Sequence, residues 1–238
     1  MTTVDPIPER ALVISAHPDD LDFGCSGTVA LWRRAGADVT YVICTNGDKG
    51  SNDPSLTPEE IATIRQGEQV AAARTVGVDR VIFLGFEDGE LENDAALRKR
   101  LVEAVRRFRP QVVLCQDPGN RAFENVHVSH RDHRAAAEAA FDALYPASGT
   151  PGFFPELRAQ GLAPHRADVA LFFGTHTPNH WVDITSVIDL KIRALLCHES
   201  QVGHRGDLEQ FIRERFREAG KTPGYEYAEP FRRIVIPL

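Results

Sequence analysis

The amino-acid sequence predicts an α/β fold: a Rossmann-like, doubly wound and mostly parallel sheet with helices on both faces. Short apolar runs rich in Val, Ile and Leu alternate along the chain with longer helical patterns. Buried parallel strands are continuous apolar runs of this kind, and helices link one strand to the next. A chain of 238 residues is also long enough to bury one self-sufficient core. We therefore expect a single domain over residues 1–238.

Each element of the N-terminal half has a local justification. ALVISA at 11–16 is a six-residue apolar run and is expected to form the first strand. Thr57 is a typical helix N-cap, and Pro58 followed by two acidic residues favours a helix that runs to about Thr75. By the same patterns, further strands are expected at 39–45, 80–86 and 111–116, and further helices at 27–34 and 94–108.

The C-terminal half continues the alternation after one long irregular stretch. Residues 146–165 are rich in Pro and Gly, show no periodicity and exceed an ordinary connection in length. We interpret them as a functional loop that forms a substrate rim together with the loops at 46–58 and 117–129. Helices are expected at about 131–144 and 184–199, and strands at 169–174 and 232–238.

Composition and charge exclude several classes of function. The net charge of −7 is spread along the chain without a basic stripe, so we expect no nucleic-acid partner. No segment is apolar enough for a transmembrane helix, and the first ten residues lack the features of a secretory signal. The four cysteines are widely spaced, which predicts buried free thiols and a cytoplasmic location. The oligomeric state is open, with a homo-oligomer as one alternative.

Two polar clusters follow predicted strands. His17-Pro18-Asp19-Asp20 comes directly after the first strand, and the segment 127–133, HVSHRDH, precedes a helix after the fourth. Loops at the carboxyl ends of parallel strands converge on the ligand site of such sheets. We therefore expect the two clusters to meet.

A catalytic zinc site needs about three protein ligands and one open position for water. His17, Asp20 and His133 would supply two imidazoles and one carboxylate. A metal lowers the pKa of its water to about 7, which yields a nucleophile able to attack an amide carbonyl. The residues therefore predict a metal-dependent amidohydrolase.

Three further side chains have expected catalytic roles. Asp19 is the candidate general base, because neighbouring residues in an extended turn point in different directions, although Asp19 and Asp20 could exchange roles. His130, three residues before His133 at a helix start, would face the substrate carbonyl and stabilise the oxyanion, especially if protonated. Asp132 would orient a histidine.

These motifs resemble a known family. AHPDD after the first strand and HxDH at the start of a later helix are similar to the metal motifs of the PIG-L/LmbE-like zinc-dependent N-deacetylases. The segments TNGDKG (45–50), Arg65 with Glu68, FLGFEDGEL (83–91) and HESQ (198–201) also resemble segments of that family, in the same order. The resemblance covers most of the chain.

The resemblance implies a Rossmann-like fold, with zinc held by His17, Asp20 and His133, Asp19 as base and then acid, and His130 on the oxyanion. Ferrous iron or another divalent metal is an alternative cofactor. The implied substrate is a small N-acyl amino sugar, an N-acetylglucosamine type of sugar or conjugate that loses an acyl group, usually acetyl. The family also contains amidases of thiol conjugates, and this alternative stays open.

Two departures from the family motifs concern the surroundings of the metal. The first motif usually continues with Glu after the second Asp, whereas this chain has Leu21 and then Asp22. The second motif commonly has Pro where this chain has Arg131, which could meet an anionic substrate group. Four residues are candidate substrate contacts: Arg65, Asp88, His127 and Arg131.

Each candidate contact has a simpler interpretation. Arg65 and Glu68 could be an exposed helical ion pair, His127 a polar loop residue, and Asp48 and Asp88 turn residues. His198 and Gln201 lie near the end of a predicted helix, where a structural role is as well supported as contact with substrate.

Competing functions make different demands on the sequence. A serine hydrolase would need G-x-S-x-G and a dehydrogenase G-x-G-x-x-G after the first strand, and neither motif is present. A metal-dependent phosphoesterase is the enzymatic alternative, although it would tend to need more carboxylates. A sugar-binding module with a structural metal would normally have four protein ligands.

Overall fold

The computed structural model describes residues 6–237 and contains one seven-stranded sheet in the order β3-β2-β1-β4-β5-β7-β6. Strands β1 to β5 run parallel, whereas β7 is antiparallel to β5 and β6 is antiparallel to β7. The predicted α/β class with a mostly parallel sheet is therefore confirmed. The strands are β1 (Arg10–Ser15), β2 (Asp38–Thr45), β3 (Arg80–Phe86), β4 (Val112–Gln116), β5 (Val169–Phe173), β6 (His180–Asp183) and β7 (Ala228–Val235).

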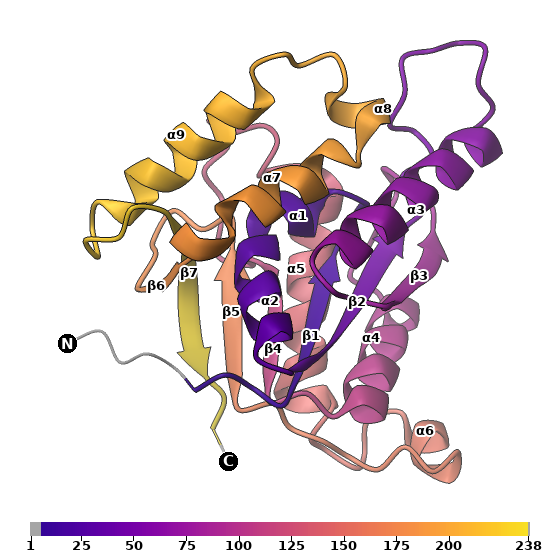
Figure 1. The fold of residues 1–238 in the computed structure, drawn as a ribbon. Coiled ribbons are helices and arrows are strands. Elements are labelled where there is room, and N and C mark those ends of the chain that lie inside the picture. Colours follow the sequence, from indigo (N-terminus) through magenta and orange to yellow (C-terminus); the bar gives the residue numbers. More distant parts are fainter. Residues whose placement is uncertain (1–5, 238) are drawn as a thin grey trace.

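Helices cover both faces of the sheet, with α1, α2, α3, α7 and α9 on one face and α4 and α5 on the other (Figure 1). Two clusters of buried apolar side chains lie between the helices and the sheet, as expected of strands that are apolar on both sides. The helices are α1 (Asp20–Gly24), α2 (Ser26–Arg34), α3 (Pro58–Thr75), α4 (Ala95–Phe108), α5 (Arg131–Asp142), η1 (Ala143–Ala147), α6 (Pro155–Ala159), η2 (Thr185–Val187), α7 (Ile188–Leu196), α8 (Glu199–Val202) and α9 (Leu208–Gly220).

Local sequence explains the longest of these helices. Thr57 caps α3 by accepting a hydrogen bond from the Glu60 N–H, and the Glu60 carboxylate accepts one from the Thr57 N–H. This reciprocal arrangement satisfies two backbone donors that a helix start leaves free. Arg65 and Gln69 are buried on the inner face of α3, so the capped helix presents both side chains toward the carboxyl end of β1.

Several elements differ from the prediction. The helix expected over 184–199 consists of η2, α7 and α8, because the chain leaves the helical path around Cys197 and His198. The last strand begins four residues earlier than expected, and β6 and α9 were not predicted. Strand β6 has only four residues and pairs with β7 alone, so it lacks the long apolar run that marks a central strand.

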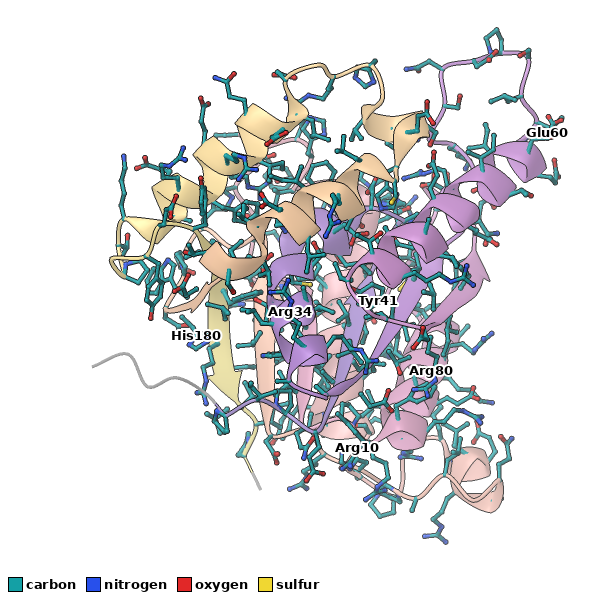
Figure 2. All side chains as sticks on the ribbon, viewed as in Figure 1. Arg10, Arg34, Tyr41, Glu60, Arg80 and His180 are labelled. Atoms are coloured by element: carbon teal, nitrogen blue, oxygen red, sulfur yellow. The ribbon has the colours of Figure 1, made fainter. Side chains whose placement is uncertain are left out.

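The two ends of the sheet carry different loops. Arg10 and Arg80 begin β1 and β3 at the lower end in Figure 2, whereas Glu60, in the first turn of α3, lies at the upper end. The loops that follow β1, β2 and β4 all leave from the upper end, where the carboxyl ends of these strands lie (Figure 1). These loops hold the two polar clusters predicted to meet.

The prediction that 146–165 forms part of the substrate rim is wrong. This segment, with α6, lies at the amino ends of the strands (Figure 1), and His165 Nε2 bonds the carbonyl of Pro110, two residues before β4. The reason is topological. Helix α5 starts at the carboxyl end of β4 and runs back across the sheet, so the loop after α5 and η1 must emerge at the opposite end.

One arginine holds the segment 146–165 in place. Arg106 on α4 is 2% exposed, and its guanidinium donates hydrogen bonds to the carbonyls of Ala147, Ser148, Thr150, Phe153 and Phe154. The segment is therefore a clamped structural loop. Within residues 6–237, no helix combines the length and apolar character that crossing a bilayer requires.

A candidate metal centre at the carboxyl end of the sheet

The turn after β1 has an unusual backbone. Asp19 adopts φ 86° and ψ −33°, a region that residues other than glycine rarely occupy. The Asp19 carbonyl accepts the N–H groups of Asp22 and Phe23, which begins α1. The tight turn leaves His17, Asp19 and Asp20 at the end of the central strand.

The structure brings His17, Asp20 and His133 together. Nδ1 of His17 lies 3.1 Å from Nε2 of His133, and Oδ1 of Asp20 lies 2.9 Å from the same Nε2. Oδ2 of Asp20 is 3.5 Å from His17 Nδ1. Ligands bound tetrahedrally to zinc at about 2.1 Å lie about 3.4 Å from one another. His17 and His133 are thus spaced like two ligands of one small cation, and Asp20 approaches His133 through Oδ1 and His17 through Oδ2.

Asp20 and His17 each use one side-chain atom for contacts with neighbouring residues, which leaves a second atom free to face a metal. Oδ2 of Asp20 accepts the backbone N–H of His17 at 2.8 Å and Nε2 of Gln116 at 2.9 Å, which leaves Oδ1 facing His133. Nε2 of His17 contacts Asp88 at 3.0 Å and Asp132 at 3.1 Å, which leaves Nδ1 facing the same point. Such outer partners fix the orientation of metal-binding side chains.

The electrostatics of the cluster favour positive charge. Burial lowers the pKa of His17, but hydrogen bonds to Asp132, Asp20 and Asp88 outweigh it and raise that pKa well above its usual value. Burial would raise the pKa of Asp20, but the neighbouring His133 and His17 hold it well below its usual range. The carboxylates thus attract a positive charge to the point between the rings, which either a proton or a metal ion can supply.

With one ligand atom taken from each residue, two groups in the described part of the chain have all their ligand atoms within 4.8 Å of one another: His17 with His130 and His133, and His17 with Asp88 and Asp132; Asp20 belongs to neither. The second group is less suited to a metal. The oxygens of Asp132 already accept the N–H groups of Gly89 at 2.6 Å and Leu91 at 3.2 Å. Asp132 thus accepts hydrogen bonds from these two N–H groups and contacts His17 Nε2, and its orienting role stays a prediction.

His130 is the N-cap of α5 and its ring borders the cluster. The Asp132 N–H donates to Nδ1 of His130 at 3.2 Å, so the neutral ring carries its proton on Nε2. Burial, together with the nearby His17 and His133, lowers the pKa of His130. A lowered pKa favours the neutral ring, with Nε2–H as its donor, over the protonated imidazole; the contact of His130 with an oxyanion stays a prediction.

Asp19 is held by two side chains of α3. Nη2 of Arg65 donates to Asp19 Oδ2 at 3.2 Å and to the Pro18 carbonyl at 2.9 Å, and Nη1 donates to the Gly47 carbonyl. The Asp19 N–H donates to Oε1 of Gln69 at 2.8 Å. Burial and the charge of Asp20 raise the pKa of Asp19 to about 6, although Arg65 opposes the shift. A carboxyl group with this pKa suits acid and base catalysis near neutral pH.

The candidate substrate contacts lie in different surroundings. Arg65 is 5% exposed and bonds Asp19 and its turn, so it is not an exposed helical partner of Glu68. Asp88 is buried against His17. Arg131 is exposed and forms ion pairs outside the cluster, and His127 is exposed in the loop before α5. Contact of any of the four with substrate stays a prediction.

Sequence reasoning missed two glutamines and gave no role to Asp22. Gln116 orients Asp20, whereas Gln69 joins Asp19 to Asp22 through a second bond of 2.8 Å. His198 also bonds Asp22, at 2.9 Å. Burial lowers the pKa of His198, but the Asp22 hydrogen bond outweighs it and raises that pKa. One signal was present: Gln69 follows Arg65 by four residues and thus shares its helix face.

Comparisons with known proteins find matches along most of the chain. A family model described as GlcNAc-PI de-N-acetylase (PIG-L) matches residues 12–144. Diacetylchitobiose deacetylase of Thermococcus kodakarensis is 35% identical over 228 residues, which cover 94% of this chain and 82% of that protein. The probable N-acetyl-alpha-D-glucosaminyl L-malate deacetylase 2 of Bacillus subtilis is 29% identical, with 86% and 89% covered.

The fold is also similar to that of a solved enzyme. The structure of N,N'-diacetylchitobiose deacetylase from Pyrococcus horikoshii, complexed with its inhibitor MPG, has a TM-score of 0.88 and 33% sequence identity. The match covers 96% of this chain and 84% of that chain. The similarity therefore extends over almost the whole of this chain.

Proposed function

The chain belongs to the PIG-L family of GlcNAc-PI de-N-acetylases, and we propose that it is a zinc-dependent deacetylase that removes an acetyl group from an N-acetylglucosamine type of sugar. One observation carries the proposal. His17 and His133 approach each other and Asp20 through nitrogen and oxygen atoms 2.9–3.5 Å apart, and Asp19, with a pKa of about 6, lies in the same turn as His17 and Asp20. A cation-binding cluster beside a base is the combination that amide hydrolysis by water requires.

The donor set fits zinc. Two imidazoles and one carboxylate are the ligands of many catalytic zinc sites and leave a position open for water. Ferrous iron accepts the same ligand types and is the alternative metal. When bound, the metal would lower the pKa of water to about 7 and polarise the amide carbonyl.

The protein side chains divide the remaining work. Asp19 takes a proton from the attacking water, whose oxygen forms a bond with the acyl carbon. Nε2–H of His130 donates a hydrogen bond to the carbonyl oxygen as negative charge develops there. When the C–N bond breaks, Asp19 returns the proton to the departing amine. Asp132 and Asp88 hold His17 throughout.

The charges beside the cluster favour a substrate without an anionic group. Arg131 donates to Glu90 at 2.9 Å and to Glu92 at 3.1 Å, and Lys49 pairs with Glu87 at 3.1 Å. Three carboxylates are thus paired with two cations, so an anionic group of a substrate would have to compete with these carboxylates for Arg131 or Lys49. Arg131 is therefore a weaker candidate for anion recognition than its place in the second motif indicated.

These charged side chains belong to segments that contact the cluster directly. The N–H of Gly89 donates to Asp132 at 2.6 Å, and the N–H of Lys49 donates to Asp88 at 3.0 Å. Asp132 and Asp88 in turn contact His17.

The same balance of charge disfavours the alternative of a phosphoesterase, whose substrate is an anion. An amidase of thiol conjugates remains the second candidate.

A small N-acyl amino sugar is thus the proposed partner. We also infer a reducing, cytoplasmic compartment, because Cys25, Cys44 and Cys115 are buried free thiols and Cys197 is partly buried and unpaired. Burial raises the pKa of Cys44 and of Cys115 to beyond the range in which a thiolate forms, so neither thiol is a catalytic nucleophile.

The test is hydrolysis by the purified protein loaded with zinc. Diacetylchitobiose, N-acetylglucosamine and an N-acyl thiol conjugate are incubated separately, and acetate release is followed together with the mass loss of one acetyl group. We expect release from the acetylated sugars and none from protein stripped with a chelator. Equal activity of stripped and loaded protein, or phosphate release from a phosphomonoester with no acetate from any sugar, would contradict the proposal.

A further inference from the structure

A chain of three buried side chains links the junction of α7 and α8 to the backbone of Asp19. His198 Nε2 bonds Oδ2 of Asp22 at 2.9 Å. The same Oδ2 accepts Nε2 of Gln69 at 2.8 Å, and Oε1 of Gln69 accepts the Asp19 N–H at 2.8 Å. His198, Asp22 and Gln69 are all 0% exposed. None of the three belongs to the proposed ligands or to the general acid and base.

The series of hydrogen bonds from His198 through Asp22 and Gln69 ends at Asp19, where the backbone is strained. Asp19 has φ 86° without being a glycine, a conformation that costs about 1–3 kcal/mol and persists only when its surroundings impose it. The turn orients the Asp19 N–H toward α3, where Gln69 accepts it. Without an acceptor the buried N–H would lose its hydrogen bond, so Gln69 stabilises the strained conformation directly.

The partners of Gln69 fix which way its amide faces. Its oxygen must accept from the Asp19 N–H, so its NH2 group faces Asp22 and donates to it. Asp22 receives a second donor from His198, and this side chain is held by the turn between α7 and α8. The hydrogen bonds therefore converge on the Asp22 carboxylate: Asp19 donates to Gln69, Gln69 donates to Asp22, and His198 donates to the same oxygen of Asp22.

The segment 198–201 is itself tied to the site from several sides. Ser200 donates through both its N–H and its hydroxyl to Glu68 of α3, and Gln201 donates to the Gly50 carbonyl in the loop after β2. His198 is therefore a fixed point relative to α3 and to the loop after β2. Its position can influence Asp19 because the three hydrogen bonds between them are each 2.8–2.9 Å long.

We propose that His198, Asp22 and Gln69 are positioning residues that hold the Asp19 carboxylate in its catalytic orientation. The inference rests on the proposed deacetylase function and extends it to residues outside the cluster. Arg65 contacts the Asp19 carboxylate itself, whereas this chain acts on the peptide that carries it. Loss of the hydrogen bonds that link His198, Asp22 and Gln69 to Asp19 should slow the proton transfers of Asp19 and leave substrate binding and metal binding in place.

The experiment compares variants that remove hydrogen bonds between His198, Asp22, Gln69 and Asp19 with variants that keep them. His198→Leu removes the donor to Asp22, whereas His198→Gln retains an amide NH2 that can reach it. Gln69→Met keeps the side-chain volume and removes both hydrogen bonds. His204→Leu, at an exposed histidine of the same region, is the matched control. Each protein is assayed for kcat and KM on diacetylchitobiose, for metal content and for Tm.

We expect kcat to fall about 10- to 100-fold in His198→Leu and Gln69→Met, with KM and metal content close to those of the wild type. His198→Gln should recover most of kcat, and His204→Leu should match the wild type. The proposal is overturned if kcat is unchanged, if His198→Gln is as slow as His198→Leu, or if the loss of kcat follows a loss of metal.

A crystal structure of Gln69→Met gives a readout that does not depend on activity. We expect the Asp19 peptide to rotate out of its positive-φ conformation, and an unchanged Asp19 would overturn the proposal. If the wild type releases no acetate from any substrate, the proposed function fails, yet this structure still decides the role of Gln69. If His198→Leu does not fold, Gln69→Met and His198→Gln remain decisive.

Discussion

Nδ1 of His17 lies 3.1 Å from Nε2 of His133, although 116 positions separate the two residues in the sequence. Two neutral ring nitrogens that both present lone pairs at this distance repel each other, so a positive charge between them stabilises the arrangement. The approach arises because the turn after β1 and the start of α5 both lie at the carboxyl end of the sheet. Several measurable properties depend on this contact.

Metal removal is expected to abolish activity and lower stability together. A ligand at about a hundredfold excess over its Kd stabilises the folded state by about 3 kcal/mol, which corresponds to a Tm shift of about 5–10 °C in a domain of this size. Differential scanning calorimetry with and without a chelator measures the shift. His17→Ala should show the lower Tm in both conditions. An equal response of His17→Ala and wild type to zinc would contradict the assignment of His17.

Asp19→Asn is expected to retain the metal and to lose turnover. The amide keeps the shape of the side chain but cannot take a proton from water, so kcat should fall about a hundred- to ten-thousandfold. Metal analysis and acetate release measured on one preparation separate the two properties. If Asp19→Asn keeps full activity while Asp20→Asn loses it with metal still bound, the two aspartates have exchanged roles.

The pH dependence of kcat/KM should show an acidic limb. Burial and the charge of Asp20 raise the pKa of Asp19 to about 6, and only the deprotonated carboxylate acts as a base. The rate should therefore rise as the pH increases through the pKa of Asp19 and fall as the pH decreases through it. A bound cation lowers this pKa, so the midpoint should lie at or below about pH 6. A profile measured from about pH 5 to about pH 8 that rises only above neutrality would contradict it.

The glutamates paired with Arg131 should set a preference against anionic acceptors. Glu90→Gln combined with Glu92→Gln frees the guanidinium, so the ratio of kcat/KM for an anionic N-acetylglucosamine derivative to that for diacetylchitobiose should rise about threefold. The rise should shrink at high salt, because the groups are exposed. Glu103→Gln, which lies on α4 and pairs with Arg107, is the control and should leave the ratio unchanged.

Arg106→Met should destabilise the fold without altering catalysis. The guanidinium bonds five carbonyls in the segment 147–154, and its loss leaves buried acceptors without donors. We expect the free energy of unfolding to fall by about 3 kcal/mol or more, with kcat and KM near wild type. Arg107→Met, at an exposed neighbour on the same helix, should change stability little. A shift of substrate preference in Arg106→Met would restore a rim role to this loop.

The central sheet was predictable because each strand is a separate apolar run. The first four strands and the helices after them agree with their predicted ranges to within two residues at most ends. The meeting of the two polar motifs was predictable for a related reason: His17 follows β1 directly and His133 lies in the first turn of the helix after β4, and the carboxyl ends of parallel strands meet at one edge of the sheet. Local pattern and topology therefore gave the same result.

The remaining features depend on contacts that no local pattern records. Gln116 lies at a strand end that its neighbours explain fully, so nothing in its surroundings marks it as a partner of Asp20. For Gln69, the sequence offers only its place on the same helix face as Arg65, which does not identify its partners. The segment 146–165 has the composition of a functional loop, and only the direction of α5 places it at the other end of the sheet. Strand β6 exists because β7 pairs with it, and four residues without a strong apolar pattern do not predict that pairing.

The segment 146–165, which Arg106 holds in place, offers an attachment site for immobilising the protein in one orientation. Gly152 is exposed, and a Cβ built there meets no heavy atom within 4 Å, so Gly152→Cys would provide an accessible attachment point. A support coupled at this point would hold the amino ends of the strands against its surface and turn the opposite edge toward the bulk liquid. An immobilised film of this kind could be stripped with chelator, reloaded with different metals and compared on a single batch of protein.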